Sequence, residues 1–429
     1  MMTVLGIVIF FAGILFSVAW HELGHFATAK WFGIKVPEFM VGFGKTLWSR
    51  KVGETEFGLK AIPLGGYIRM IGMIPPAKGE ILGRSRRTGP FQGLIDDARQ
   101  QSAMEVRPED ADRQFYLRAP WKRIIVMAAG PVMNLILAVV LFAIVLMGFG
   151  VPTTTTTISS VSACVVPATA TTEVCPPDAP PTPAAAAGFR PGDRIVAFNG
   201  TPYDDWDDMR RAIREASGTV TVTVERGGQT IDLHPTLITT DLIDIDDPNG
   251  ERIVQGSFLG LAPLVAVQRE DLAGVADEIG EVITRTGEAV INLPQRVPDV
   301  FGSAFLGEER RLDSPVGIVG ASRLGGEILA SEAPASQTIA FFLQLLALVN
   351  ISLFLFNLLP IPPLDGGQIF PAIWEAVKRR IAKLRGQPDP GPVDVAKLLP
   401  VAYVVALIFI AWSGMLFIAD IVNPVRLPQ

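Results

Sequence analysis

The sequence predicts an α-helical polytopic membrane protein with about four transmembrane helices, a membrane-associated β-segment and a β-rich domain outside the cytoplasm. Three observations lead to this fold class. The 429-residue chain is 49% hydrophobic and has a positive mean hydropathy, yet it contains long polar stretches, as expected for membrane helices that alternate with water-facing segments. Four runs reach the roughly 20 apolar residues that a spanning helix needs. Basic residues concentrate in two of the segments between those runs.

The four apolar runs cover residues 3–28, 124–151, 338–359 and 398–422. The first has no basic region and no small-residue cleavage site, so we expect a retained helix rather than a signal peptide. The predicted segments are 1–30 (first span), 31–76 (β-segment), 77–123 (insertion), 124–151 (second span), 152–265 (β-rich domain), 266–337 (amphipathic helix and connector), 338–367 (third span), 368–397 (basic loop) and 398–429 (fourth span and C-terminus).

The distribution of charge predicts the topology. Lys and Arg are dense in residues 30–123 and 368–397 and almost absent from the termini. By the positive-inside rule, both basic segments are cytoplasmic, whereas the termini and residues 152–337 lie outside. The net charge of −6 is modest, and the sequence shows no basic run suited to nucleic acid. We therefore expect a multi-pass protein of the plasma membrane that has membrane lipid, and no nucleic acid, among its partners.

Two segments between the spans have β-like patterns. Residues 39–73 are short apolar runs punctuated by glycine, which predicts hairpins shielded against the helices on the cytoplasmic side. Outside, residues 188–233 predict the order strand, helix, strand, turn, strand. Residues 77–118 predict only weak or local structure, and residues 272–290 predict an amphipathic helix that packs on the neighbouring domain or lies near the membrane face.

The two cysteines, Cys164 and Cys175, both lie in the segment expected outside, within a Thr-, Pro- and Ala-rich stretch. A disulfide persists in that environment. A small-loop disulfide is therefore the expectation, and two unpaired thiols in a flexible segment are the alternative.

The motif HELGH ends the first apolar run. His21 and His25 are four residues apart, so on a helix their imidazoles share a face and can bind one metal ion. Glu22 is then placed to act as general base on a metal-bound water. Ionisable groups within a spanning segment are costly, by about 2.5–3.5 kcal/mol for a central charge. A hydrogen-bonded cluster between helices is the alternative explanation.

A catalytic zinc site uses three protein ligands and keeps a position open for water. Asp365, in the sequence NLLPIPPLDGG, is the first carboxylate after the third apolar run, where prolines and a Gly-Gly pair break the helix. The charge topology places this end and the HELGH end on the same side of the membrane. Asp365 is therefore the expected third ligand, and a helix cap is its alternative role.

These motifs together resemble those of the site-2 protease family, the intramembrane zinc metalloproteases of peptidase family M50. HELGH and NLLPIPPLDGG are similar to the two zinc-site motifs of that family, and AAGPVMN, at residues 128–134, is similar to its AGPxxN stretch. VGFGKTLW and IPLGGYIRM resemble the membrane-associated β-segment of the bacterial branch that cleaves anti-sigma factors. GFRPGDRIVAFNG resembles bacterial PDZ domains, for which GSFLGLAP would supply a closing strand. The chain has room for one PDZ-like domain rather than two.

The resemblance implies roles for individual residues. His21, His25 and Asp365 would bind one zinc ion, Glu22 would activate water, and Asn357 would help to position the substrate backbone. Main-chain pairing with one strand edge would hold an unwound substrate segment. The residues of that edge are Gly65, Gly66, Tyr67, Ile68, Arg69 and Met70.

The resemblance also implies a function, which is cleavage of single-span membrane proteins in or near their transmembrane segment by a zinc endopeptidase. The implied substrates are anti-sigma factors already cut by another protease, as in regulated intramembrane proteolysis, with the site near the cytoplasmic face. The PDZ-like domain would bind or screen trimmed substrates. The alternative function is a catalytically inactive membrane scaffold that binds partners through the PDZ-like domain.

Overall fold

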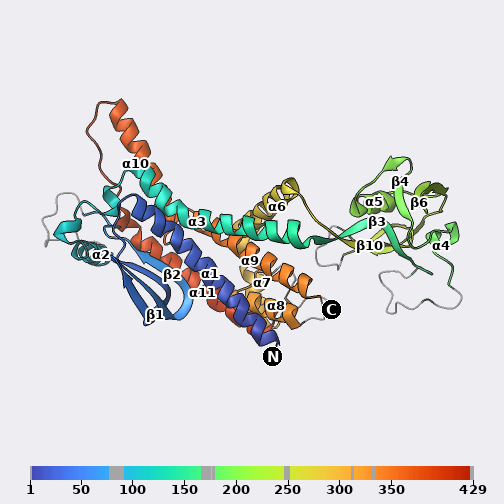
Figure 1. The fold of residues 1–429 in the computed structure, drawn as a ribbon, viewed down its shortest axis with the longest axis horizontal. Coiled ribbons are helices and arrows are strands. Elements are labelled where there is room, and N and C mark those ends of the chain that lie inside the picture. The colour runs from blue at the N-terminus through green and yellow to red at the C-terminus, as the bar shows by residue number, and fades with distance from the viewer. Residues whose placement is uncertain are drawn as a thin grey trace. The chain divides into compact units, whose positions relative to one another are not determined.

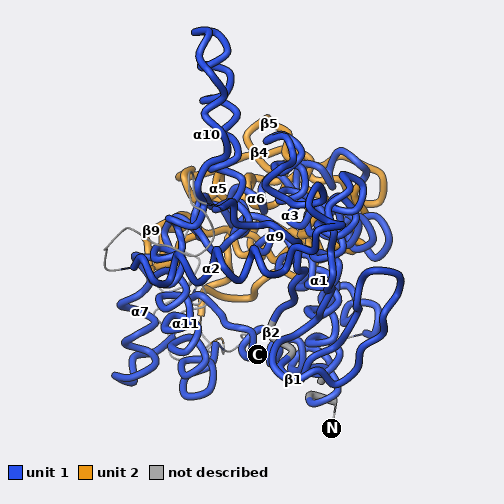
Figure 2. The backbone as a smooth tube through the Cα atoms, turned by 90° about the vertical axis from the view of Figure 1, so that its left-hand side faces the viewer, with its two compact units in different colours: residues 1–149, 271–310, 314–429 blue, residues 150–270, 311–313 orange. Residues whose placement is uncertain are grey.

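The computed structural model describes residues 2–76, 91–165, 175, 179–245, 252–310, 314–330 and 334–425 (Figure 1). The chain forms two compact units. Unit 1 comprises residues 1–149, 271–310 and 314–429, and unit 2 comprises residues 150–270 with 311–313 (Figure 2).

Unit 1 contains four helices that are long and apolar enough to cross a membrane, which confirms the four predicted runs. They are α1 (Met2–Trp31), α3 (Pro120–Ala143, continued by the π-helix Ile144–Phe149), α9 (Ala335–Leu358) and α11 (Leu399–Val422). The second begins four residues earlier than its apolar run predicts, because Pro120 occupies the first turn, where its missing N–H leaves no hydrogen bond unmade. The third helix ends at Leu358, so Asp365 lies in the turn beyond it.

Glycines allow α1 to approach its neighbours closely. A Cβ added at Gly24, within HELGH, would overlap the carbonyl oxygen of Ala129 on α3. A Cβ at Gly6 would lie 2.8 Å from the Cα of Gly326 on α8 (Ile318–Ala330). Small residues at helix crossings permit this backbone contact in membrane proteins. The HELGH helix is therefore seated against α3 by its own glycine.

Shorter helices complete unit 1. They are α2 (Gln92–Met104), α6 (Leu272–Ile291), α7 (Val297–Phe301, continued by the π-helix Gly302–Leu306) and α10 (Gly366–Leu384), with 3-10 turns at Pro108–Asp110, Phe115–Leu117, Leu293–Arg296 and Val395–Leu398. The amphipathic helix expected at residues 272–290 is present as α6. Of the insertion for which only local structure was expected, residues 77–90 lie outside the described residues, and the remainder contains α2 and two 3-10 turns.

Within the basic loop predicted between the third and fourth spans, residues 368–397, the first half is helical as α10, which the sequence pattern did not predict. Apolar residues recur there at helical spacing, as in Phe370, Ile373, Trp374, Val377 and Ile381. Charged residues between these apolar positions made the helical spacing hard to recognise in the sequence. Arg123 of α3 and Glu375 of α10 form a buried ion pair at 2.5 Å, and Glu375 also accepts a hydrogen bond from the main-chain N–H of Val393 at 2.9 Å. This ion pair fixes α10, and with it the turn that carries Asp365, against α3.

The β-segment is a folded hairpin of β1 (Glu38–Val52) and β2 (Thr55–Arg69), in which residues 46–52 pair with 55–60 and residues 38–41 pair with both 56–59 and 66–69. A small core attaches it to the end of α1 and the start of α3; the buried members are Ala29, Ile34, Val36, Met70, Phe115, Val126 and Met127. At the hairpin turn, Glu54 pairs with Lys30 of α1 and accepts two hydrogen bonds of 2.7 Å from Arg113. The Arg113 guanidinium, followed by Lys30, lowers the pKa of Glu54 to about 2.

A second buried ion pair lies at the other end of the helices. Arg310 contacts Asp420 of α11 at 2.7 Å, and both side chains are about 1% exposed. Asp420 also accepts a hydrogen bond of 2.8 Å from the main-chain N–H of Gly320 on α8. Because each charge has a partner, the pair joins α8 and α11 without an isolated buried charge.

Unit 2 is built on one sheet with the strand order β10-β3-β4-β6-β7, in which β5 pairs with β4. The strands are β3 (Val151–Val161), β4 (Arg194–Phe198), β5 (Thr201–Pro202), β6 (Val222–Arg226), β7 (Gln229–Leu233) and β10 (Leu261–Gln268), and β8 (Ile238–Ile243) pairs separately with β9 (Ile253–Phe258). Two helices, α4 (Pro183–Ala187) and α5 (Trp206–Glu215), accompany them. The expected order of strand, helix, strand, turn, strand is thus present as β4, α5, β6 and β7.

The core of unit 2 lies between α5 and the sheet. Trp206 and Met209 of α5 are buried with Ile195, Val222 and Val224 of the strands. Residues at alternate positions of β6 point into this core, as expected of a strand with one buried face. Cys164 and Cys175 form a disulfide, with their Cα atoms 5.8 Å apart, which confirms the pairing rather than the alternative of two thiols.

Asp193 is a buried carboxylate of unit 2 that pairs with Arg226. Its side chain is 1% exposed and accepts two hydrogen bonds of 2.7 Å from Arg226, plus one of 2.8 Å from the main-chain N–H of Arg190. The Arg226 hydrogen bond is the main influence that lowers the pKa of Asp193. The charged carboxylate therefore stabilises the folded sheet.

Asp193→Asn is expected to loosen unit 2 in a pH-dependent manner. At neutral pH, amide hydrogen exchange in β4 and β6 of the full-length protein should accelerate roughly tenfold, because a charged hydrogen bond is lost. The folded pKa lies below the unfolded value of about 3.9, so this stabilisation is complete above that value and disappears as the pH falls through the folded pKa. The difference between the proteins should therefore shrink below about pH 4. A constant difference across this range would contradict the assignment.

Candidate metal centre

The two histidines of HELGH lie on one face of α1, one turn apart, as their spacing predicts. Both are buried, at 8% and 4% exposure, and their Nε2 atoms are 3.1 Å apart. Two neutral imidazole nitrogens have no reason to meet at this distance unless one donates to the other or both face a shared cation. Their approach therefore places two potential metal-ligand atoms side by side.

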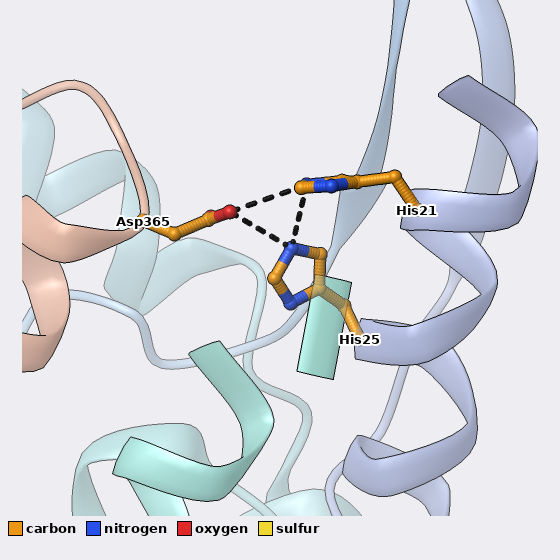
Figure 3. A group of neighbouring side chains, drawn as sticks. All are labelled: His21, His25 and Asp365. Carbon is orange, nitrogen blue, oxygen red and sulfur yellow. Dashed lines mark hydrogen bonds and ion pairs between the residues drawn. The ribbon is translucent and has the colours of Figure 1, made fainter. Parts of the chain in front are cut away.

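Asp365 meets this pair from the turn between α9 and α10. Its Oδ2 lies 3.2 Å from His21 Nε2 and 3.3 Å from His25 Nε2 (Figure 3). Asp365 occupies the N-cap position of α10, yet its side chain makes no capping hydrogen bond. The alternative role of a helix cap is therefore wrong, and the carboxylate points at the imidazoles.

The Gly-Gly pair makes this turn possible. A Cβ at Gly366 would overlap the Leu359 carbonyl oxygen, and one at Gly367 would lie 2.5 Å from the Pro362 nitrogen. Only glycines allow the first turn of α10 to pack this closely on the preceding chain. The prolines and glycines that break the helix thus also fix the position of Asp365.

The three side chains fit a zinc ion. Their three ligand atoms are separated by 3.1, 3.2 and 3.3 Å, and the described residues contain no other group of three or more candidate metal ligands. Tetrahedral bonds of about 2.0–2.1 Å place neighbouring ligand atoms roughly 3.3–3.4 Å apart. Asp365 Oδ2 is buried without a hydrogen-bond donor, as expected of an atom that faces a cation. Two nitrogens and one oxygen are the ligand set of a catalytic zinc that keeps its fourth position open.

Helix α3 forms the floor of the site. His25 Nδ1 lies 2.7 Å from the Val126 carbonyl oxygen, and His21 Nδ1 lies 3.1 Å from Nδ2 of Asn134. Between them, a Cβ at Gly130 would overlap His25 Nε2 and lie 2.7 Å from His21 Nε2. Sequence reasoning placed Gly130 and Asn134 in a family motif but gave neither a role, and it missed Val126, since a backbone acceptor leaves no trace in the sequence.

Glu22 lies at the junction of α1 and the hairpin. Its carboxylate receives a hydrogen bond from the main chain of Ile68, and a Cβ at Gly66 would lie 3.1 Å from Glu22 Cγ. The predicted general base therefore lies directly against β2. Two of the six residues predicted to line the substrate edge, Gly66 and Ile68, are thereby placed beside it.

The other residues predicted to bind substrate have different surroundings. Tyr67 donates a hydrogen bond to Glu38 at 3.1 Å, and Arg69 pairs with Glu38 at 2.9 Å. Gly65 has a positive φ of 111°, and Met70 follows the end of β2 with its side chain buried in the core. Their pairing with a substrate strand stays a prediction.

Asn357 is not brought to the ligand group by any described contact. Its amide nitrogen donates to the Leu353 carbonyl oxygen of its own helix at 3.0 Å. Its predicted role in positioning substrate therefore rests on the resemblance alone.

Gly130→Ala is expected to abolish zinc retention, because the added methyl group would occupy the space of the two Nε2 atoms. Gly148→Ala is the matched control: it is a glycine of the same span with nothing within 4 Å of an added Cβ. Metal analysis of the two purified variants should find zinc only in the control. Stoichiometric zinc in the Gly130 variant would contradict the described geometry.

Comparison with known proteins agrees with this centre. The sequence model of peptidase family M50 matches residues 9–399 of the chain. The chain is similar to zinc metalloprotease Rip1 of Mycobacterium tuberculosis, with 34% identity over 440 residues and 100% of each chain covered. Rip1 of Mycolicibacterium smegmatis is 32% identical over 440 residues with the same coverage. Metalloprotease MmpA of Caulobacter vibrioides is 28% identical over 429 residues, or 96% of each chain. The chain therefore belongs to peptidase family M50 and is a multi-pass membrane zinc metalloendopeptidase.

Proposed function

We propose that this protein hydrolyses a peptide bond in or near the transmembrane segment of single-span membrane proteins. His21, His25 and Asp365 hold the zinc ion, and Glu22 is the catalytic base. The observation that carries this proposal is the convergence of three buried ligand atoms within 3.3 Å of one another, next to a carboxylate and a β-hairpin.

The position of each side chain determines its role in the reaction. Bound zinc polarises a carbonyl and makes a water molecule acidic enough to lose a proton near neutral pH. Glu22, adjacent in sequence to the ligand His21, accepts the proton of the attacking water. The same carboxyl group then passes this proton to the departing amine nitrogen, so that the base is regenerated in each turnover. Its hydrogen bond with the Ile68 main chain holds the carboxylate toward β2.

The hairpin offers main-chain hydrogen bonds to a substrate segment that has unwound. A transmembrane helix satisfies all its backbone groups internally, so its peptide bonds are inaccessible until it unwinds. An extended segment placed alongside β2 regains those hydrogen bonds by strand addition. Because Gly66 and Ile68 lie against Glu22, a segment bound at this edge would run past the catalytic base.

The proposed orientation places the site near the cytoplasmic face. The basic residues of 30–123 and 368–397 lie on that side, and the termini and unit 2 lie outside. Unit 2, the PDZ-like domain of the proposal, would screen substrates there. The proposed substrates are anti-sigma factors that another protease has already trimmed. An inactive scaffold finds less support, because it has no need of a complete ligand set with a base beside it.

Glu22→Gln is expected to retain zinc and to lose about 10²–10⁴-fold in cleavage rate, because the proton acceptor is removed while the ligands stay in place. The assay uses purified protein with a tagged single-span substrate, and a zinc chelator serves as the negative control. Asp365→Asn is the companion variant and should lose zinc as well as activity. Cleavage at the wild-type rate by Glu22→Gln would contradict the proposed mechanism.

Replacing residues 152–265 with a flexible linker tests the screening role. The shortened protein should cleave full-length substrates that the wild type leaves intact, and both proteins should cleave a pre-trimmed substrate at similar rates. The pre-trimmed substrate is thus the control for an intact active site. If full-length substrates remain uncut while the trimmed one is processed, the screening role is wrong.

A further inference from the structure

Three positions of α3 line the back of the histidine pair. Val126, Gly130 and Asn134 recur every four residues, so they share one face of the helix. Val126 contacts His25 through its carbonyl oxygen, and Asn134 contacts His21 through its side chain. Gly130 leaves room for the two imidazole rings, because it has no Cβ. Asn134 is fully buried, and its Oδ1 has no hydrogen-bond partner.

We propose that Asn134 is a positioning residue for zinc: its Oδ1 accepts the Nδ1 proton of His21 and thereby directs the Nε2 lone pair of that ring at the metal. The proposal rests on the metal centre described above. It assigns to the side chain of Asn134 the role that the backbone of Val126 has for His25, so that one helix orients both imidazoles.

The chemistry of imidazole requires an acceptor at Nδ1 when Nε2 binds a metal. A neutral ring that binds a metal through Nε2 carries its proton on Nδ1, so the group facing Nδ1 must accept a hydrogen bond. An amide presents Nδ2 or Oδ1 at the same place after a rotation of 180°. Only Oδ1 accepts, and it is the atom that lacks a partner in the orientation described. Zinc binding and the rotated amide therefore favour one another.

The packing of α1 against α3 does not require the Asn134 side chain. The indole Nε1 of Trp20 on α1 already donates to the Met133 carbonyl oxygen on α3 at 2.9 Å. Gly24 seats the same helix against Ala129. The two helices are thus joined at Trp20, just before the histidines, and at Gly24, between them. Neither contact involves the Asn134 amide, which contacts a ligand ring instead.

The test is the zinc affinity of the full-length purified protein, measured by competition with a chelator. Asn134→Leu should weaken zinc binding about 10- to 100-fold, the usual effect of losing the partner of a ligand histidine. Asn134→Asp supplies only acceptor oxygens and should bind zinc within about threefold of the wild type, or more tightly. If the leucine variant does not fold, Asn134→Ala takes its place in the comparison with the aspartate.

Asn350→Leu is the matched control. Asn350 is an equally buried amide of a spanning helix, also with an unpartnered Oδ1, but it donates to Ser17 Oγ at 2.8 Å rather than facing a ligand. Its variant should bind zinc as the wild type does. Nearly unchanged affinity in Asn134→Leu would overturn the proposal, and so would equal losses in the leucine and aspartate variants or an equal loss in Asn350→Leu. A wild-type protein that binds no zinc would instead overturn the metal centre itself.

A second readout separates orientation from packing. The chain has only three histidines, so the imidazole N–H resonances of ¹⁵N-histidine-labelled protein are few. At saturating zinc, the Nδ1–H of His21 should exchange slowly with solvent in the wild type and the aspartate variant, and faster in the leucine variant. Equal exchange in all three proteins would contradict the hydrogen bond.

Discussion

Two imidazoles and a carboxylate share one small volume between apolar helices, and the rest of unit 1 is arranged to hold them there. A charged side chain at the centre of a spanning segment costs about 2.5–3.5 kcal/mol even on the lenient insertion scale. Coordination of one cation offsets that cost, provided that the ligand atoms lie within a few tenths of an ångström of a tetrahedral arrangement. The distances of 3.1–3.3 Å among the three atoms meet this condition.

The ligands come from segments far apart in the sequence, so the site depends on close contacts between backbones. Gly24 brings α1 onto α3, Gly130 leaves room for the imidazoles, and the Gly366-Gly367 pair folds the Asp365 turn tightly. The buried pair of Arg123 and Glu375 then fixes α10 against the same helix. Helix α3 contributes none of the three candidate ligands, yet it contacts both segments that carry them.

The sequence allowed most of the chemistry to be predicted, because ligands and bases are side chains. The spacing of His21 and His25 and the broken helix before Asp365 led to the three-ligand group that the structure assembles, and the apolar runs led to four spanning helices. The supporting contacts were not predictable in the same way. A carbonyl acceptor such as that of Val126 has no sequence signature, and a glycine such as Gly130 reveals only that some close approach exists. Helix α10 was missed because its apolar period is interleaved with basic residues.

The most direct test of the metal centre is X-ray absorption at the zinc edge, on the purified wild-type protein and on Asp365→Cys. The wild type should show a four-coordinate shell of nitrogen and oxygen with imidazole scattering and no sulfur. The cysteine variant should show one sulfur at about 2.3 Å in place of the carboxylate oxygen. If the variant binds zinc without a sulfur ligand, or if the wild-type shell lacks imidazole, then zinc is not held by His21, His25 and Asp365.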